Sequence, residues 1–386
     1  MSWPVVRLGD VVDFIGGSQP PKEEFLYEER NGYIRMLQIR DYKSDANKTY
    51  IPLKLARRFC TKDDIMIGRY GPPVFQILRG MEGAYNVALM KAEPTNKVDK
   101  NYLYHFLKQD SLFRLIDGLS QRTAGQSGVD MDALKSYPMI LPDLSEQKRI
   151  AVILDKADAI RRKRQQAIKL ADDFLRSVFL EMFGDPVTNP KGWEVKSLKN
   201  LASKIGSGST PRGGKEAYIS EGISLIRSLN IHDDEFLHKN LAFITDKQAK
   251  ELSNVTIEKN DVLLNITGAS VCRCSLVDNS VLPARVNQHV CVIRPKDMEP
   301  EYLLHMLIST SYKQQLLRIA QSAGATREAL TKDQVENLKI PVPPQDLQRK
   351  FSTIKGGVKA MLAKAQYSNE IPLFESLSQK AFSGMI

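Results

Sequence analysis

Residues 142–148, PDLSEQK, have the types and spacing of a nuclease site, in which carboxylates hold Mg²⁺ and a lysine assists a water nucleophile. The alternative is a helix start, with Asp143 and Glu146 bonding exposed backbone N–H groups. A related motif, VPPQDLQRKF at 342–351, also contains Pro and then Gln followed by two basic residues. It has neither Glu nor Lys at the equivalent spacing. The comparison favours a helix cap over a nuclease site, with one such helix start in each half of the chain.

A glycine-rich stretch, GSGSTPRGGK at 206–215, invites comparison with a phosphate-binding loop. Ser209 stands where that motif needs its first Gly, and Glu216 follows Lys215 in place of Ser or Thr. Nucleotide hydrolysis is therefore disfavoured. A loop that contacts the DNA backbone and a plain structural turn both remain open.

Cysteines and histidines offer two further chemistries. Cys272 and Cys274, with His289 and Cys291 nearby, have residue types that bind zinc, but the corresponding stretch of the first half lacks them, so we expect buried core cysteines and no metal. His105 and His305 recur in similar helical segments, yet no Ser, Cys or paired acid accompanies both, which favours helix packing over catalysis. No N/D-P-P-Y/F/W tetrapeptide is present to hold a flipped adenine.

Composition narrows the class of protein. The 386 residues carry a formal charge of +10, which favours a polyanionic partner because neutralised phosphates release counterions. Four cysteines are too few for a disulfide framework, and no stretch reads as a secretory leader or membrane span. We therefore expect a cytoplasmic protein that does not contact a membrane.

The chain repeats itself at an offset that drifts between 190 and 201 residues. The closest match is NYLYHFL (101–107) with EYLLHML (301–307). Other matching segments, in chain order, are Trp3 to Leu8 with Trp193 to Leu198, Ile15-Gly16 with Ile205-Gly206, Ile34-Arg35 with Ile226-Arg227, and Asp64-Ile65 with Asp261-Val262.

Each half has one plan, a mixed domain followed by a helical arm. Short alternating runs broken by Gly and Asn predict strands, and apolar residues at helical spacing predict helices. We expect an α+β fold with two tandem mixed domains at 1–142 and 186–343, and two long helices at 143–185 and 344–386 that pair as an antiparallel coiled coil.

The arms carry the predicted pairing surface. Residues 145–183 contain no Gly or Pro, so a continuous helix of roughly 58 Å is available. The residues expected to pack between the arms are Ile150, Leu154, Ile168, Leu175, Phe351, Ile354, Val358 and Met361. Gly356-Gly357 and Pro372 predict that the second arm is the more bent.

Taken in order, these motifs resemble those of the specificity subunits of type I restriction-modification systems. The marks are Trp193 to Pro211, the junction Leu141 to Ile150, and Phe183-Gly184 at the end of the helix, and the resemblance covers essentially the whole chain.

The resemblance implies a non-catalytic subunit that reads a bipartite DNA target, one half per domain, with the helices setting the spacer. It implies two methyltransferase and two restriction subunits as partners, with S-adenosylmethionine, ATP and Mg²⁺ bound by those partners and not by this chain.

Side chains able to make bidentate hydrogen bonds to bases are the candidates for DNA contact. We predict pairs across the repeat, Arg35 and Gln38 with Arg227 and Asn230, and Arg69-Tyr70 with Ile266-Thr267. Further candidates are Ser18, Gln19, Lys22, Arg212, Lys215 and Arg327. Arg161 to Arg164 form either a solvated helix face or a contact to DNA phosphate or the methyltransferase.

Three other hypotheses compete with this interpretation. The chain is also compatible with the separate specificity chain of a type II restriction-modification enzyme. A self-sufficient nuclease or methyltransferase and a coiled-coil scaffold with peptide-binding domains are the remaining two.

Overall fold

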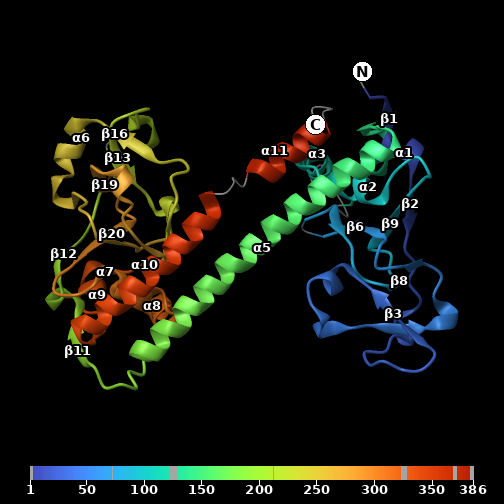
Figure 1. Ribbon diagram of the computed structural model, residues 1–386. Helices are drawn as coiled ribbons and strands as arrows, with labels where there is room; N and C mark the ends of the chain where they lie inside the picture. The colour runs from blue at the N-terminus through green and yellow to red at the C-terminus, as the bar shows by residue number, and fades with distance from the viewer. Residues whose placement is uncertain are drawn as a thin grey trace. The chain divides into compact units, whose positions relative to one another are not determined.

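A computed structural model describes residues 3–71, 73–120, 128–211, 213–322, 328–367 and 372–382. Its contacts divide the chain into a first unit, Met1–Gln165 with Ser368–Ile386, and a second unit, Gln166–Tyr367. Both units mix helices with short strands (Figure 1). The predicted α+β class is confirmed, while the predicted domain boundaries at 142, 185 and 343 stay predictions.

The first unit contains two four-stranded sheets and one two-stranded sheet, with strand orders β2-β9-β6-β7, β4-β3-β8-β5 and β1-β10. Their strands are β1 (Val5–Arg7), β2 (Val12–Gly16), β3 (Tyr33–Leu37), β4 (Tyr50–Pro52), β5 (Phe59–Cys60), β6 (Ile65–Gly68), β7 (Gln76–Leu78), β8 (Gly83–Tyr85), β9 (Leu89–Pro94) and β10 (Pro138–Ile140). The unit's helices are α1 (Leu8–Val11), α2 (Lys100–Leu107), α3 (Asp110–Ser120), α4 (Met131–Ser136) and α11 (Pro372–Ala381).

The second unit repeats this plan with strand orders β12-β20-β17-β18, β16-β13-β19, β11-β21 and β14-β15. Its strands are β11 (Glu194–Ser197), β12 (Ala202–Ser207), β13 (Ile223–Ile226), β14 (Ile231–His232), β15 (Glu235–Phe236), β16 (Ala242–Ile244), β17 (Val262–Asn265), β18 (Cys274–Leu276), β19 (Ala284–Val286), β20 (Val290–Pro295) and β21 (Lys339–Val342). Its helices are α6 (Asp246–Glu251), α7 (Pro300–Ile308), α8 (Thr310–Ser322), α9 (Lys332–Glu336) and α10 (Gln345–Tyr367).

Each unit has separate hydrophobic clusters in its helical and its strand-rich part. In the second unit, one cluster joins α7 and α8 to β17 and β20, and another fills the space among β13, β16 and β19. Figure 1 shows the same separation, with β13, β16 and β19 at the end of the unit away from α8 and α9. The strand-rich part of the unit and its helical part therefore have separate hydrophobic cores.

The central arm is a single helix, α5 (Leu144–Phe183), as the sequence predicts. Ile150 and Leu154 are buried in the core of the first unit, and Leu175 is buried within the second. The ring centroids of Phe179 in α5 and Phe351 in α10 lie 5.5 Å apart, which places both helices at one core.

Other predicted packing residues differ in exposure. Ile168 and Met361 are exposed, whereas Ile354 and Val358 are half-buried. Pairing of the two arms along their full length, and the stronger bend of the second arm, stay predictions. None of the helices in the described ranges combines the length and apolar character that crossing a bilayer needs.

The repeated Pro-to-Gln motif, at 142–148 and 343–350, joins each domain to its arm through one buried glutamine. Gln147 accepts a hydrogen bond from the backbone N–H of Asp99 at 2.8 Å and donates to the carbonyl of Pro142 at 2.8 Å. Gln348 accepts from the N–H of Glu299 at 3.0 Å and donates to the carbonyl of Pro343 at 2.8 Å. The two side chains are 0% and 1% exposed.

Both glutamines thus hold the start of an arm against the start of α2 or α7. A tyrosine in each helix adds a second tie, since the Tyr102 hydroxyl donates to the Ile140 carbonyl at 2.8 Å and the Tyr302 hydroxyl donates to the Pro341 carbonyl at 2.7 Å. Because backbone groups left unpaired in a buried site are costly, these side chains fix the junction.

We predict that Gln348→Ala destabilises the second unit by about 2–4 kcal/mol, because it leaves a partly buried N–H and a buried carbonyl without their side-chain partner. Urea unfolding followed by circular dichroism measures this change. Gln345→Ala, at an exposed position at the start of the same helix, is the matched control. Equal effects of the two variants would contradict the assigned role of Gln348.

Candidate nucleic-acid interface

In the first unit, the structure brings together two of the loops predicted to contact DNA. The backbone N–H of Ser18 donates to the Tyr85 carbonyl at 3.1 Å, and the N–H of Arg69 donates to the Ala88 carbonyl at 2.8 Å, so both loops meet the segment before β9. A Cβ added to Gly16 would lie 3.6 Å from Nη1 of Arg69. The Arg69 side chain therefore lies beside the loop that carries Ser18.

Arg69 and Tyr70 also contact each other, with the guanidinium carbon 5.2 Å from the centroid of the tyrosine ring. A guanidinium over an aromatic face is held by cation–π attraction while its N–H edge stays available to hydrogen-bond acceptors. Gln19 and Lys22 are exposed farther along the loop after β2, and Lys22 begins a short 3₁₀ turn, Lys22–Glu24.

Arg35 lies in β3 and Gln38 directly follows it, where the Leu37 carbonyl accepts from the N–H of Asn86 at 3.1 Å in the same segment before β9. Nη2 of Arg35 is 2.7 Å from Oδ1 of Asp45 and 3.5 Å from Oδ1 of Asp41. Nε2 of Gln38 donates to the Thr49 hydroxyl at 3.1 Å. Both side chains therefore have partners within their own domain.

The candidates of the second unit are similarly engaged. Nη2 of Arg227 donates to the Asn240 carbonyl at 2.5 Å, and its guanidinium lies over the Tyr218 ring. Asn230 is 0% exposed, and its amide donates to the Leu237 carbonyl at 2.9 Å. The Thr267 hydroxyl bonds to Nδ1 of His289.

Three predicted residues cannot be placed with the others. Arg212 and Arg327 lie outside the described residues. Lys215 belongs to a 3₁₀ turn, Gly214–Ala217, and at this position the structure describes only the backbone.

The structure corrects one set of predicted pairs across the repeat. The N–H of Asn86 donates to the Leu37 carbonyl at 3.1 Å, and the N–H of Asn287 donates to the Ile226 carbonyl at 3.1 Å, so Leu37 corresponds to Ile226. Gln38 is therefore the counterpart of Arg227, and Arg35 is not. The shift arises because the connection from β12 to β13 is shorter than that from β2 to β3.

A smaller correction applies to β2 and β12. The register of β12 against β20 shifts between Ala202 and Lys204, which inserts one residue that β2 lacks. Phe14 consequently occupies the place of Ile205, and the sequence match of Ile15 with Ile205 is off by one. A β-bulge of this kind is invisible to comparison of residue types alone.

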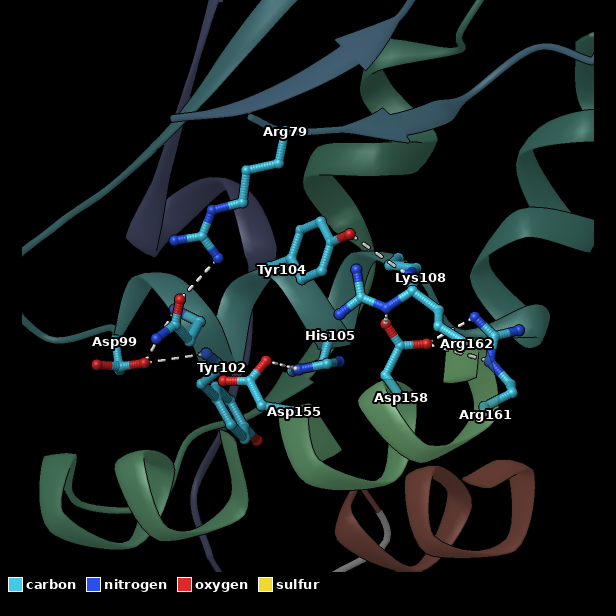
Figure 2. Close-up of polar contacts among 11 residues, drawn as sticks. Arg79, Asp99, Tyr102, Tyr104, His105, Lys108, Asp155, Asp158, Arg161 and Arg162 are labelled. Atoms are coloured by element: carbon cyan, nitrogen blue, oxygen red, sulfur yellow. Dashed lines mark hydrogen bonds and ion pairs between the residues drawn. The ribbon is translucent and has the colours of Figure 1, made fainter. Parts of the chain in front are cut away.

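The duplicated histidines are buried in helix packing, and their surroundings differ. Figure 2 shows His105 of α2 facing Asp155 of α5, with Nε2 2.8 Å from Oδ1. Burial lowers the pKa of His105, although Asp155 opposes this shift. In the second unit, Nε2 of His305 lies 3.6 Å from Asp234, which comes from the turn between β14 and β15.

Asp234 belongs to a partly buried charge cluster that the sequence comparison missed. Its Oδ1 accepts hydrogen bonds from the ammonium groups of Lys355 at 2.7 Å and Lys359 at 3.0 Å, and Lys355 also bonds to Glu301. Lys355 is 0% exposed. Asp234, Glu301 and His305 have the residue types and proximity of a metal site, but the Lys355 ammonium already supplies a cation to both carboxylates.

This cluster distinguishes the two halves of the repeat. The Pro-to-Gln motif aligns Leu154 with Lys355, so an apolar residue in the first arm corresponds to a buried lysine in the second. No local signal could reveal the cluster, because Asp234, Glu301 and Lys355 come from three elements far apart in the sequence.

The acidic residues of the first junction act as a helix start. Oδ1 of Asp143 accepts from the backbone N–H of Glu146 at 2.9 Å, and Glu146 pairs with Arg149 at 2.6 Å. Hydrogen bonds from the Ser145 hydroxyl and from the Glu146 N–H lower the pKa of Asp143. The geometry is that of a capping residue and a surface ion pair.

The four cysteines are all buried. Burial raises the pKa of Cys272 and of Cys291 to about 12, so both thiols are neutral at physiological pH. They contribute to the same hydrophobic cluster as Cys274 and act there as small apolar side chains.

Comparison with known proteins adds independent findings. A family model described as "Type I restriction modification DNA specificity domain" matches residues 1–170 and 190–354. The MjaVIII type I restriction enzyme specificity subunit of Methanocaldococcus jannaschii is 22% identical over 368 residues, covering 90% of this chain and 84% of that protein. The EcoBI specificity subunit of Escherichia coli is 23% identical over 443 residues, covering 99% and 86%.

A solved structure has a similar fold. The crystal structure of a type I restriction-modification S subunit from M. genitalium superimposes with a TM-score of 0.63, covering 99% of this chain and 96% of that one at 14% identity.

We predict that Asp234→Asn destabilises the second unit by about 3 kcal/mol, because it removes a carboxylate partner from a buried lysine. Burial alone would raise the pKa of Asp234, but His305, Lys355 and Lys359 outweigh it and lower the pKa below the usual value of 3.8. A depressed carboxyl pKa stabilises the fold above pH 4 and loses that contribution as pH falls further.

The wild type should therefore lose stability on acidification more steeply than Asp234→Asn, as measured by urea unfolding at pH 3 to 7. Asp45→Asn, which removes an exposed partner of Arg35, is the control and should change stability little. Parallel pH profiles for wild type and Asp234→Asn would refute the linkage.

Proposed function

The chain belongs to the family of type I restriction modification DNA specificity domains, and from this premise we propose that it reads a bipartite DNA target, one half in each domain. It is the specificity subunit of a restriction-modification complex, and it recognises DNA without catalysing a reaction on it. Phosphate contacts position such a protein on the duplex, and base contacts in the grooves specify the sequence.

The observation that carries this proposal is the repetition of one backbone plan with different side chains. Both units tie a domain to an arm through the same buried glutamine, and both carry the same four-stranded sheet order around β9 or β20. The side chains on the loops differ, as Arg69 and Tyr70 against Ile266 and Thr267 illustrate. One backbone fold that carries two different sets of loop side chains suits a DNA target with two different half-sites.

The proposal assigns the spacer between the half-sites to the helical arms. α5 extends over residues of both units, and a helix of 40 residues is about 60 Å long at ~1.5 Å per residue. Its length and the pairing of the arms would fix the distance between the half-sites.

We further propose the partners and their cofactors. Two methyltransferase subunits dock on the helical arms, and two restriction subunits complete the nuclease. S-adenosylmethionine, ATP and Mg²⁺ bind to those subunits. The basic character of the chain, with a formal charge of +10, supports DNA as the polyanionic partner.

Sequencing of methylated bases in the source genome, with and without this chain, tests the central claim. We expect the chain's removal to erase one motif that consists of two short specified parts separated by unspecified positions. A single contiguous motif, or an unchanged set of methylated sites, would reject the proposal. Cleavage near the target without ATP would instead favour a type II enzyme.

We predict that inserting four residues after Ala167, an exposed position in α5, lengthens the spacer and leaves both half-sites intact. The insertion adds about 6 Å to the helix and rotates the C-terminal part of α5 by roughly 40° relative to its N-terminal part. A seven-residue insertion at the same point adds about 10 Å with little rotation and is the matched comparison. The preferred spacer is measured by methylation of a set of DNA targets that differ only in spacer length. An unchanged preference in both variants would reject the proposal that α5 sets the spacer.

A further inference from the structure

Two hairpins, one in each unit, enclose loops of equal length. Residues 69–75 join β6 to β7, and residues 266–272 lie between β17 and β18, where the residues flanking each loop pair as Gly68 with Gln76 and Asn265 with Arg273. Each loop closes with the same hydrogen bond, because the N–H of Phe75 donates to the Gly68 carbonyl at 3.0 Å and the N–H of Cys272 donates to the Asn265 carbonyl at 2.8 Å.

Both loops are tied at their first residue to the same neighbours. The N–H of Arg69 donates to the Ala88 carbonyl, and its carbonyl accepts from the N–H of Val129 at 3.1 Å. In the second unit, the N–H of Ile266 donates to the His289 carbonyl at 3.0 Å, and its carbonyl accepts from the N–H of Leu330 at 2.8 Å. The closing bond and the two bonds at the first residue of the first loop thus recur in the second.

The last residue of each loop has an unusual backbone conformation. Phe75 has φ +63° and Cys272 has φ +66°, although neither is glycine. Left-handed backbone is sterically unfavourable for residues that carry a Cβ, and for a bulky residue it is a real outlier. Such conformations persist only where the surroundings enforce them, and they concentrate at functional sites.

Burial enforces the conformation here. Phe75 is 2% exposed and Cys272 is fully buried, and each belongs to the main hydrophobic cluster of its unit. The preceding residues, Val74 and Val271, are buried in the same clusters. Each loop is therefore anchored at its far end by two buried side chains, at the expense of backbone strain.

Several of the remaining positions differ in chemistry, although Gly71 and Gly268 match. Arg69 and Tyr70 in the first loop correspond to Ile266 and Thr267 in the second, and the exposed Pro73 corresponds to the half-buried Ser270. A frame that is kept in both copies, with exchanged side chains at its first two residues and at Pro73 or Ser270, suits two domains that read different sequences.

We propose that the loops carrying Arg69 and Tyr70 in the first unit, and Thr267 and Ser270 in the second, are the specificity-determining loops of this protein. The inference rests on the proposed DNA-reading function and deepens it. Phe75 and Cys272 are positioning residues, which hold the loops in one conformation before DNA binds. Preorganisation lowers the ordering cost of binding and sharpens discrimination.

The chemistry of the first loop indicates what it reads. A guanidinium can donate two hydrogen bonds to O6 and N7 of guanine in the major groove, and no other pairing of an arginine with a base edge is as favourable. The Tyr70 ring under the guanidinium restricts its orientation. The half-site read by the first domain should therefore contain a guanine that Arg69 specifies.

The second loop offers hydroxyl groups in place of a guanidinium. Thr267 is oriented by His289, and the Ser270 hydroxyl accepts from Nδ2 of Asn265 at 3.2 Å. Hydroxyls bond to several base edges, and the threonine methyl contacts thymine. Exchange of these side chains should change the second half-site and leave the first unchanged.

The test is the methylated motif produced by the complete complex carrying Arg69→Gln or Arg69→Lys. Both variants should relax one guanine of the first half-site at least tenfold, while the second half-site and the spacer stay the same. Arg79→Gln is the matched control, because Arg79 lies just beyond β7 of the same hairpin and donates to Asn101 at 2.7 Å. The control should leave the motif unchanged.

Three outcomes would overturn the inference for Arg69. An unchanged motif means that Arg69 does not read a base. A uniform loss of affinity for all sequences, with a shallower salt dependence, means that it contacts phosphate. Loss of methylation at both half-sites in both variants means that it supports the fold. In each case a bipartite wild-type motif would still uphold the proposed function, so the two failures are distinguishable.

A second experiment addresses the anchor. Cys272→Gly permits the left-handed backbone but frees the loop, whereas Cys272→Ala retains a Cβ at the same position. We expect Cys272→Gly to broaden the second half-site severalfold relative to Cys272→Ala, with the first half-site unchanged. Equal motifs for the two variants would overturn the role of the anchor, as would an equal broadening of both half-sites in Cys272→Gly.

Discussion

One buried amide at each junction holds the molecule's plan together. Gln147 and Gln348, both buried, each accept from the N–H of the residue before a domain helix and donate to a proline carbonyl at the start of an arm. A buried donor or acceptor without a partner costs more than a hydrogen bond contributes, so arrangements that break these bonds are disfavoured. Together with Tyr102 and Tyr302, these two side chains orient each domain relative to the start of its arm.

Apart from this shared junction, the two units differ in the charged residues that contact their arms. The first unit places His105 opposite Asp155 of its own arm, whereas the second draws Asp234 from a turn between strands to meet His305 and two lysines of α10. Buried ion pairs contribute little net stability but strongly penalise misplacement of either partner. The cluster therefore couples the strand-rich part of the second unit to its arm, and the first unit has a simpler contact at that place.

In the hairpin loops, by contrast, the backbone hydrogen bonds are shared by the two units and the side chains differ. Strain at Phe75 and Cys272 is tolerated because each side chain is packed in a core, and the same core packing keeps the neighbouring residues in place. A loop held in this way can exchange Arg69 for Ile266 without changing its backbone. That property suits the proposed reading of two different half-sites with one fold.

The sequence by itself determined the repeat, the α+β class, the helix over 144–183 and the family, because these depend on local periodicity and on motifs that recur in order. It also suggested Arg69, Tyr70 and Thr267 as DNA contacts, and that assignment stays a prediction. Only the tertiary structure decided which residues correspond, because a bulge in β12 and a shortened connection before β13 shift the register without leaving a mark in composition. It alone revealed the charge cluster around Asp234 and the left-handed anchors, since both depend on contacts between distant segments and on backbone angles that packing imposes.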